Sequence, residues 1–383
     1  LTSFKKGAIY EVVYSSSDNK LYLTNYEQIG VVTDTANGLM PYTYKKNIDN
    51  SDLHSKFADW TVSYLPDGEM SGYSNGNNKI ISTIDGFFVI KQGSEYIYFS
   101  NDGTYWTAIC CGNLGIEDIC YVGDYGLYFA IYNTDNTAIL MYSNNGFEWK
   151  EASSFSNYYF KKIKALSYRN TIVIAASNSS DSTEDVLIIM QCDIYTGIMG
   201  EEIIISNSKF NNSLIMDIDI DEKQESEEIY IAADDGDIYV IDTDDIDFDN
   251  TEADITVTNL GVSIAMSKSI LVYDGICIVN TSSSYVRVDK NGNTANNSYF
   301  NGCSNVFKIC TDYDDGTNLL IQVSNYGVIH ISYDWKNWVD YDIYKYNGFG
   351  VHNNYNFSSI YSIAYDETYR DTIVIMTSTG MYT

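Results

Sequence analysis

The sequence predicts an all-β protein, a single β-propeller of about seven four-stranded blades, from three observations. An apolar strand recurs at residues 86–91, 126–132, 171–177, 228–234, 275–281, 318–324 and 372–378. The starts of these runs are between 40 and 57 residues apart. A second strand-like run follows each copy and a short one precedes it. This number and spacing of strands is typical of propeller blades.

The recurring runs have the composition of buried strands. They are short, rich in β-branched and aromatic residues, and bounded by Gly, Asn and Asp, as strands and their turns are. They are apolar on both faces, which is expected of strands packed between two neighbouring blades. The spacing of apolar residues that helical repeats require is absent.

The two ends of the chain bear on how the ring closes. The last repeat stops at 380–383 without an outer strand, and two strand-like runs at 7–15 and 20–26 belong to no repeat. One N-terminal strand would complete the last blade and remove an open sheet edge. Both runs could instead form an eighth blade. Residues 27–79 are the least repetitive, and we expect an elaborated insertion between blades there, within one domain spanning 1–383.

Three hairpins carry a tighter motif, Ser-x-Asp/Asn-x-x-x-Trp. An Asp or Asn side chain can accept hydrogen bonds from nearby backbone N–H groups and hold a tight turn. A Trp ring can pack beneath the hairpin while its indole N–H finds a partner. The motif therefore predicts a structural staple. Its residues are Ser100, Asp102 and Trp106; Ser143, Asn145 and Trp149; and Ser332, Asp334 and Trp338.

These three motifs resemble the Asp-box, or bacterial-neuraminidase repeat, of sialidase-like propellers. The resemblance implies the fold and not the activity, because propellers host both enzymes and binding proteins. A working sialidase would need three converging arginines, a Tyr nucleophile paired with Glu, and an Asp acid/base. Arg169 and Arg370 occupy matching turns of two repeats, Arg287 lies mid-strand, and the family's early Arg-Ile-Pro motif is absent. We predict that the chain is not an enzyme.

The charge is strongly negative, with 52 acidic against 22 basic residues and a net charge of −30. A surface of this sign repels phosphate backbones and anionic lipids, so we expect no nucleic-acid partner. The sequence contains no apolar stretch of about 20 residues, so we expect no membrane insertion. The acidic runs 217–222 and 242–249 could offer oxygens to Ca²⁺ but lack the Gly and distal Glu of an EF-hand. They are interpreted as solvated loops, with no cofactor or metal expected.

Seven cysteines are irregularly spaced, several within apolar runs. This favours buried free thiols over a disulfide framework and folding in a reducing cytoplasm or an anaerobe. The N-terminus has neither Met nor the apolar region of a signal peptide. We therefore expect the sequence to start within a longer protein or after processing.

Tyrosine is abundant, with 36 copies, and Tyr and Asn dominate the segments 156–160, 293–302 and 341–357. Flat rings with hydroxyl and amide groups suit sugars, although a low-GC genome would enrich the same residues. Exposed aromatic residues in loops are candidate ligand contacts. These candidates are Trp60, Tyr64, Trp335, Tyr341 and Tyr346.

The leading functional hypothesis is non-catalytic recognition of a cell-surface carbohydrate or glycoprotein. Propellers of this acidity and composition look like receptor-binding proteins of phage tails and tail-like bacteriocins of low-GC Gram-positive hosts. We expect such a protein on the particle surface, beside other subunits, or otherwise extracellular. One alternative is a secreted, sialidase-like glycoside hydrolase on the same scaffold. A second alternative is a bacterial surface adhesin.

Overall fold

The computed structural model describes residues 11–15, 20–24, 62–66 and 78–383, with gaps at 93, 111–114, 123–125, 136, 167–169, 179–180, 194–195, 223–226, 250–251, 266, 313–316, 325–328, 342–358, 367–371 and 379. The chain divides into two compact units, 1–58 and 59–383. In the first unit, β1 (Glu11–Ser15) and β2 (Lys20–Thr24) form an antiparallel hairpin. Among the described residues, no helix has the length and apolar character to cross a membrane.

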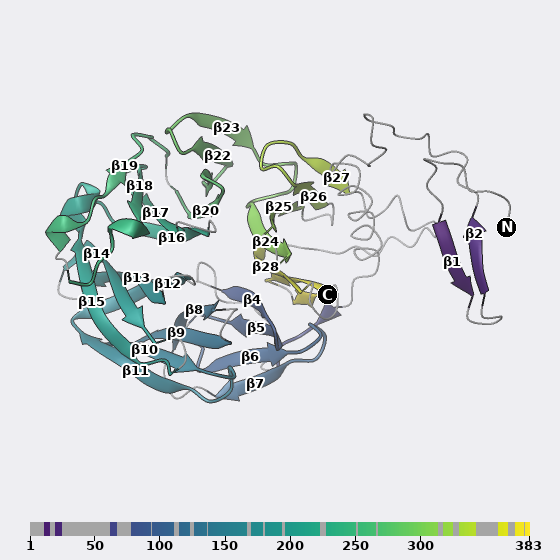
Figure 1. The fold of residues 1–383 in the computed structure, drawn as a ribbon, viewed down its shortest axis with the longest axis horizontal. Helices are drawn as coiled ribbons and strands as arrows, with labels where there is room; N and C mark the ends of the chain where they lie inside the picture. Colours follow the sequence, from purple (N-terminus) through teal and green to yellow (C-terminus); the bar gives the residue numbers. More distant parts are fainter. Residues whose placement is uncertain are drawn as a thin grey trace. The chain divides into compact units, whose positions relative to one another are not determined.

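The second unit is a β-propeller of seven four-stranded antiparallel sheets, which confirms the predicted fold. The first strand of each blade lies nearest the centre of the ring (Figure 1). These first strands are β4 (Lys79–Thr83), β8 (Ile116–Val122), β12 (Tyr158–Leu166), β16 (Ile215–Glu222), β20 (Ser269–Tyr273), β24 (Phe307–Asp312) and β28 (Ile360–Asp366). The blades are numbered 1 to 7 in this order. The second strands are β5 (Gly86–Ile90), β9 (Leu127–Asn133), β13 (Thr171–Asn178), β17 (Glu227–Ala233), β21 (Ile276–Asn280), β25 (Thr317–Val323) and β29 (Thr372–Thr377).

The outer half of each blade completes the ring. The third strands are β6 (Tyr96–Ser100), β10 (Thr137–Ser143), β14 (Asp181–Cys192), β18 (Ile238–Asp242), β22 (Ser284–Asp289), β26 (Ile329–Ser332) and β30 (Met381–Tyr382). The fourth strands are β7 (Thr107–Cys110), β11 (Lys150–Ser156), β15 (Met199–Ser206), β19 (Thr258–Asn259), β23 (Thr294–Ser298), β27 (Val339–Tyr341) and β3 (Val62–Ser63). Short 3-10 helices follow β15 and β18: η3 (Asn207–Phe210), η4 (Thr243–Asp245) and η5 (Glu252–Asp254).

The recurring apolar runs are the second strands, and their two faces pack against different blades. In β5 every residue is buried. Phe87 and Val89 pack with Val374 of blade 7, whereas Phe88 and Ile90 pack with residues of blade 2. A strand between two blades has no solvent-facing side, and this explains why polar and apolar residues do not alternate in it.

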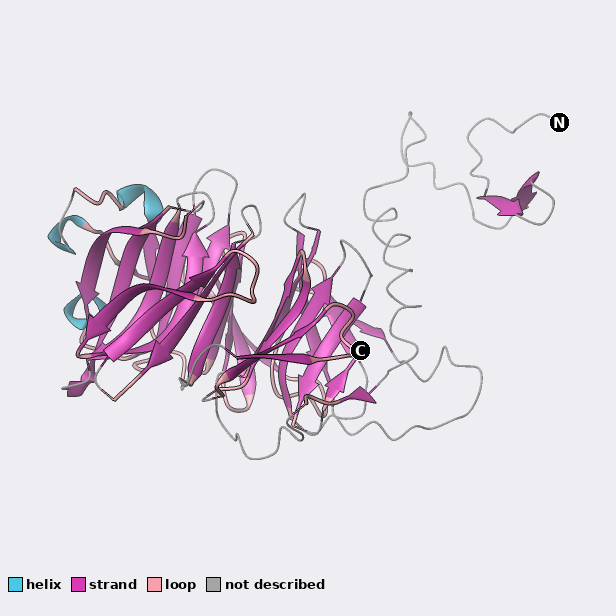
Figure 2. Cartoon of the chain, turned by 90° about the horizontal axis from the view of Figure 1, so that it is seen from below, coloured by secondary structure: helices cyan, strands magenta, loops and turns pink. Residues whose placement is uncertain are grey.

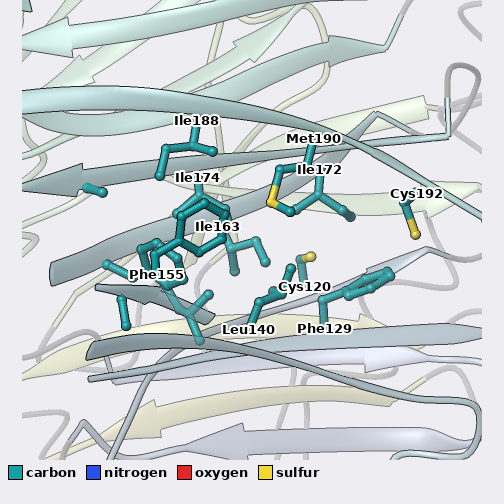
Figure 3. Close-up of a cluster of buried hydrophobic side chains, with 14 of the residues drawn as sticks. Cys120, Phe129, Leu140, Phe155, Ile163, Ile172, Ile174, Ile188, Met190 and Cys192 are labelled. Carbon is teal, nitrogen blue, oxygen red and sulfur yellow. The ribbon is translucent and has the colours of Figure 1, made fainter. Parts of the chain in front are cut away.

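The core consists of such layers between blades. Figure 3 shows the layer between blades 2 and 3, which includes Phe129 of β9 and Ile174 of β13 and in which Cys120 and Cys192 are buried. Both cysteines are free thiols. Burial raises the pKa of each thiol to about 12. For these two residues the prediction of thiols acting as small apolar side chains is confirmed.

A strand from the N-terminal side closes the ring, but it is not the one expected. β3 pairs with β30 and becomes the fourth strand of blade 7. The runs at 7–15 and 20–26 were expected to supply this strand, and β1 and β2 pair with each other instead. Pairing two neighbours in sequence requires only a short loop to close. The predicted insertion at 27–79 lies mostly outside the described residues, and nothing tests it.

Because successive strands run antiparallel, the loops gather on two rims at opposite ends of the strands (Figure 2). We call the "hairpin rim" the one with the turns between first and second strands and between third and fourth strands. The "connection rim" has the turns between second and third strands and the connections from one blade to the next.

Candidate functional site

The three Ser-to-Trp hairpins fold alike, each joining a third to a fourth strand. In the first, Oδ1 of Asp102 accepts hydrogen bonds from the backbone N–H groups of Thr104 and Tyr105, at 2.8 and 3.1 Å. The second has Asn145 in this role, with N–H donors at 2.9 and 2.9 Å. In the third, Oδ1 of Asp334 accepts at 2.9 and 2.7 Å. The side chain at this position organises the turn in all three.

The indole N–H groups of these hairpins have different acceptors. Trp106 donates to Oγ of Ser63 in β3, at 3.1 Å, and Trp338 donates to the hydroxyl of Tyr285 in β22, at 2.9 Å. Trp149 donates to the carbonyl of Gly146 in its own hairpin, at 2.9 Å. Two of the three hairpins are thus tied to the preceding blade.

The expected exposure of Trp335 at a hairpin tip is wrong, because this side chain is 3% exposed. Trp335 has a φ of 58° where the other two hairpins have Gly103 and Gly146, with φ of 75° and 72°. A Cβ at Gly146 would lie 2.4 Å from Phe88 of the preceding blade, so this position faces inward. Trp335 accordingly lies 5.6 Å from the ring of Tyr273 in blade 5.

The acidic run 217–222 is not a solvated loop but part of β16. Asp217, Asp219 and Asp221 are 8%, 2% and 0% exposed. They accept hydrogen bonds from backbone N–H groups of blade 5: Ile270 at 3.0 Å, Val272 at 2.8 Å and Asp274 at 2.9 Å. A first strand has a free edge on the axis side, and the carboxylates of the neighbouring blade satisfy its unpaired N–H groups.

Two lysines neutralise the buried carboxylate of Asp219. Asp219 contacts Lys164 of β12 at 2.7 Å and Lys308 of β24 at 2.5 Å. Burial alone would raise the pKa of Asp219, but the two ammonium groups hold it well below its ordinary value. Asp118 of β8 likewise contacts Lys79 at 2.9 Å, and its pKa is lowered by Lys79 and Lys162 against the opposing effect of burial.

The second acidic run, 242–249, behaves as predicted for a loop. It contains η4 on the hairpin rim, and Asp245 and Asp249 in it are exposed. Within the described ranges, no group of three or more His, Cys, Asp or Glu residues is arranged to hold a metal ion.

A polar and aromatic cluster lies on the connection rim where the first strands of blades 2 and 3 begin. Nε2 of Gln92 donates to Oε2 of Glu117 at 2.7 Å, and Asn133 holds the backbone of Phe160 through bonds of 2.7 and 2.8 Å. Next to Phe160, Tyr159 is 46% exposed. We call Gln92, Glu117, Asn133 and Tyr159 the mouth cluster.

Electrostatics indicates that these groups are close to one another. Burial raises the pKa of Glu117, against the hydrogen bonds from Gln92 and Asn133. Burial and the carboxylates of Glu117 and Asp135 raise the pKa of the Tyr159 phenol. A half-buried carboxylate beside an exposed ring can accept hydrogen bonds from hydroxyl groups of a ligand whose apolar face stacks on the ring.

Of the predicted ligand contacts, Tyr64 lies on the connection rim beside Gly380 and is 60% exposed. Trp60 and Tyr346 lie outside the described residues, and Tyr341 is described only as the end of β27. Of the five predicted contacts, the structure thus describes the side chains of Tyr64 and Trp335 alone.

Sequence reasoning missed most of the mouth cluster. Only Tyr159 lay in a segment singled out for its Tyr and Asn content. Glu117, Gln92 and Asn133 gave no signal, because single polar residues at the ends of apolar strands are common.

Of the three arginines, Arg287 lies in β22, a third strand away from the axis. Arg169 and Arg370 lie outside the described residues.

No model of a known protein family matches the sequence, and no curated protein is similar to it. The fold is similar to the WD40 β-propeller domain of Doa1, with a TM-score of 0.51 and 11% identity over 84% of this chain and 96% of that one. BBS1N, solved in complex with ARL6DN, is similar with a TM-score of 0.54 and 11% identity over 84% and 95%. The Dos1 propeller has a TM-score of 0.51 and 10% identity over 81% and 92%. At these identities the similarity shows the fold alone.

Proposed function

We propose that this propeller is a non-catalytic recognition module, and that its mouth cluster binds a cell-surface glycan or the glycan of a glycoprotein. The observation that carries the proposal is the pairing of an exposed ring with fixed polar groups. Tyr159 is 46% exposed, and beside it Gln92 holds the Glu117 carboxylate at 2.7 Å. Sugar rings stack on tyrosines through their C–H faces, while their hydroxyl groups donate to carboxylates.

Recognition without catalysis fits the state of the axial carboxylates. Glycoside hydrolysis requires two carboxyl groups placed across the scissile bond. Asp118 and Asp219 are each bonded to lysine and to a backbone N–H group. These donors keep both carboxyl groups ionised and engaged in hydrogen bonds, which favours a structural role over that of a general acid.

We further propose what kind of protein carries this glycan-binding propeller. The Ser-to-Trp hairpins are Asp-boxes of the kind that the motif resembles, serving as turn staples. A glycan-binding propeller with a net charge of −30 and reduced cysteines suits the receptor-binding protein of a phage tail or tail-like bacteriocin. The glycan would then belong to the surface of a host cell.

The test is a glycan array followed by isothermal titration calorimetry with the best glycan. We expect Tyr159→Ala to weaken binding about tenfold, the effect of losing about 1.4 kcal/mol of stacking. Tyr105→Ala is the matched control, because Tyr105 is 79% exposed on the opposite rim. Absence of binding to any glycan, or equal weakening by the control, would contradict the proposal.

A further inference from the structure

The hairpin rim also carries exposed apolar side chains, on turns of three consecutive blades. Ile84 is 52% exposed, Tyr105 79%, Phe147 42% and Ile198 64%. Ile84 and Tyr105 belong to blade 1, Phe147 to blade 2 and Ile198 to blade 3. Isolated apolar residues on a surface are ordinary, but contiguous ones indicate a binding site.

Half-buried rings connect the side chains of blades 1 and 2. The ring of Phe147 lies 4.9 Å from that of Phe99 in blade 1. The turn that carries Ile84 lies over Tyr128 of blade 2, whose hydroxyl donates to Asp85 at 2.9 Å. Tyr128 in turn lies 4.7 Å from Tyr121 and 6.5 Å from Trp149, and Phe99, Tyr121 and Trp149 are partly exposed.

The exposed and half-buried side chains linked in this way belong to blades 1 and 2. We call the surface that they form the aromatic patch. Its residues are Ile84, Phe99, Tyr121, Phe147 and Trp149.

Carboxylates border the aromatic patch. Asp85 and Glu148 are exposed on its turns in blades 1 and 2, with Lys150 as a basic neighbour. The whole chain has a net charge of −30. An apolar centre bordered by charged residues is typical of a protein–protein interface. Because the bordering charge is negative, it favours a partner with positive charge.

We propose that the aromatic patch is a docking surface for a basic protein segment that carries apolar side chains. A second copy of this chain is the less suitable occupant, because joining two equal patches would bring two strongly negative molecules together. The patch lies at the opposite end of the strands from the mouth cluster, so a partner here leaves that cluster accessible.

The experiment uses the full chain as bait for a random 12-residue peptide library displayed on phage. The selected peptides are synthesised, and their dissociation constants are measured by fluorescence anisotropy. We expect selected peptides to have a net positive charge and at least two large apolar residues. Affinity should fall as salt rises from 0.05 to 0.5 M, since salt screens exposed charges.

Variants locate the bound peptide. Ile84→Ser with Phe147→Ser removes two exposed side chains of the aromatic patch, 52% and 42% exposed, and should weaken binding at least tenfold. Glu148→Lys should also weaken it. Tyr159→Ser, on the connection rim, is the matched control and should change nothing.

Three results would overturn the proposal. The selected peptides could be neutral or acidic, or they could bind the double variant as tightly as the original chain. Sedimentation could instead show self-association of the original chain that the double variant loses, which would assign the patch to a second copy. Glycan binding depends on the other rim, so its failure would leave this test unaffected.

Discussion

At the residue scale, charged groups at the axis of the propeller take the place of missing backbone hydrogen bonds. Asp219 bridges three blades beyond its own, through Lys164, Val272 and Lys308. Bringing the carboxylate out of water is costly, and its bonds to ammonium and amide donors offset that cost. Removing one of these charged groups therefore leaves the buried charge of the others without compensation.

Asp219→Asn should destabilise the fold by about 3 kcal/mol at neutral pH, because two lysines lose their shared carboxylate. The pKa of Asp219 is lowered in the folded state. Its contribution is thus complete above the ordinary pKa of about 3.9 and is lost as pH falls towards the folded value. Urea unfolding between pH 3 and 7 should show a shallower acid-side decline for the variant.

Asp245→Asn is the control for that measurement, because Asp245 is an exposed residue of the other acidic run. A similar loss of stability in both variants would show that the axial position has no special importance.

The proposed glycan site should respond to pH through Glu117. Burial raises the pKa of this carboxyl above 4.5, and the ionised form accepts stronger hydrogen bonds from hydroxyl groups than the protonated form does. Binding should therefore weaken as pH falls through the raised pKa. Glu117→Gln should bind more weakly at pH 7 and lose this dependence, as calorimetry across pH 4–7 would reveal. An unchanged pH profile would exclude Glu117 from the site.

Trp335→Gly sets two effects against each other. A non-glycine residue with φ of 58° costs about 1–3 kcal/mol, which glycine would relieve. Loss of a buried Trp side chain costs about 3–5 kcal/mol. We expect a net destabilisation of about 2 kcal/mol by chemical denaturation. A variant more stable than the original chain would show that backbone strain outweighs the packing.

At the element scale, the first Ser-to-Trp hairpin fastens the strand that closes the ring. Trp106 donates to Ser63 of β3, and the hydroxyls of Ser63 and Thr383 both donate to the carbonyl of Gly103, at 3.2 and 2.8 Å. A two-residue strand has few ladder bonds of its own, so these side-chain bonds carry much of its attachment.

Trp106→Phe should remove about 1 kcal/mol of stability by deleting one hydrogen bond. It should also accelerate hydrogen exchange at residues 62–63 and 381–382. Trp149→Phe is the matched change in a hairpin whose indole bonds only within itself, and exchange in blade 7 should be unaffected there. Equal exchange in both variants would contradict the role of Trp106 in closure.

The sequence predicted the elements whose composition follows directly from burial. The second strands were recognisable because both of their faces are covered, as in β5. β3 could not be recognised in the sequence, because a strand of two residues is too short to show a period of two. In β16, Asp and Ile alternate with the period of a strand, but a row of charges at alternate positions was interpreted as solvated. The lysine partners of Asp219 lie 55 and 89 residues away in the sequence, and no local pattern reveals them.

At the scale of the whole molecule, the propeller presents two chemically different rims on one rigid ring. The connection rim combines Tyr159 with Glu117, and the hairpin rim combines Phe147 with Phe99. The Tyr and Asn content of residues 156–160 pointed to the first surface. The second surface could not be predicted, because it gathers single residues from turns far apart in sequence.

Residues 59–383 form a compact unit separate from 1–58. We expect a fragment of residues 59–383 to unfold cooperatively, with a melting temperature close to that of the full chain. A fragment starting at residue 67 lacks β3, which exposes the edge of β30. It should melt at a lower temperature and self-associate through the open edge. Calorimetry and sedimentation test both, and equal melting of the two fragments would contradict the role of β3.

The shared last blade has a consequence for biosynthesis. A ribosome releases Val62 and Ser63 before the rest of the ring, whereas Met381 and Tyr382, their partners, form the last strand of the ring in sequence. This pairing cannot form until residues 381–382 have emerged, so the nascent chain must carry a nearly complete but open propeller. Its unpaired edge is the kind of surface that chaperones protect.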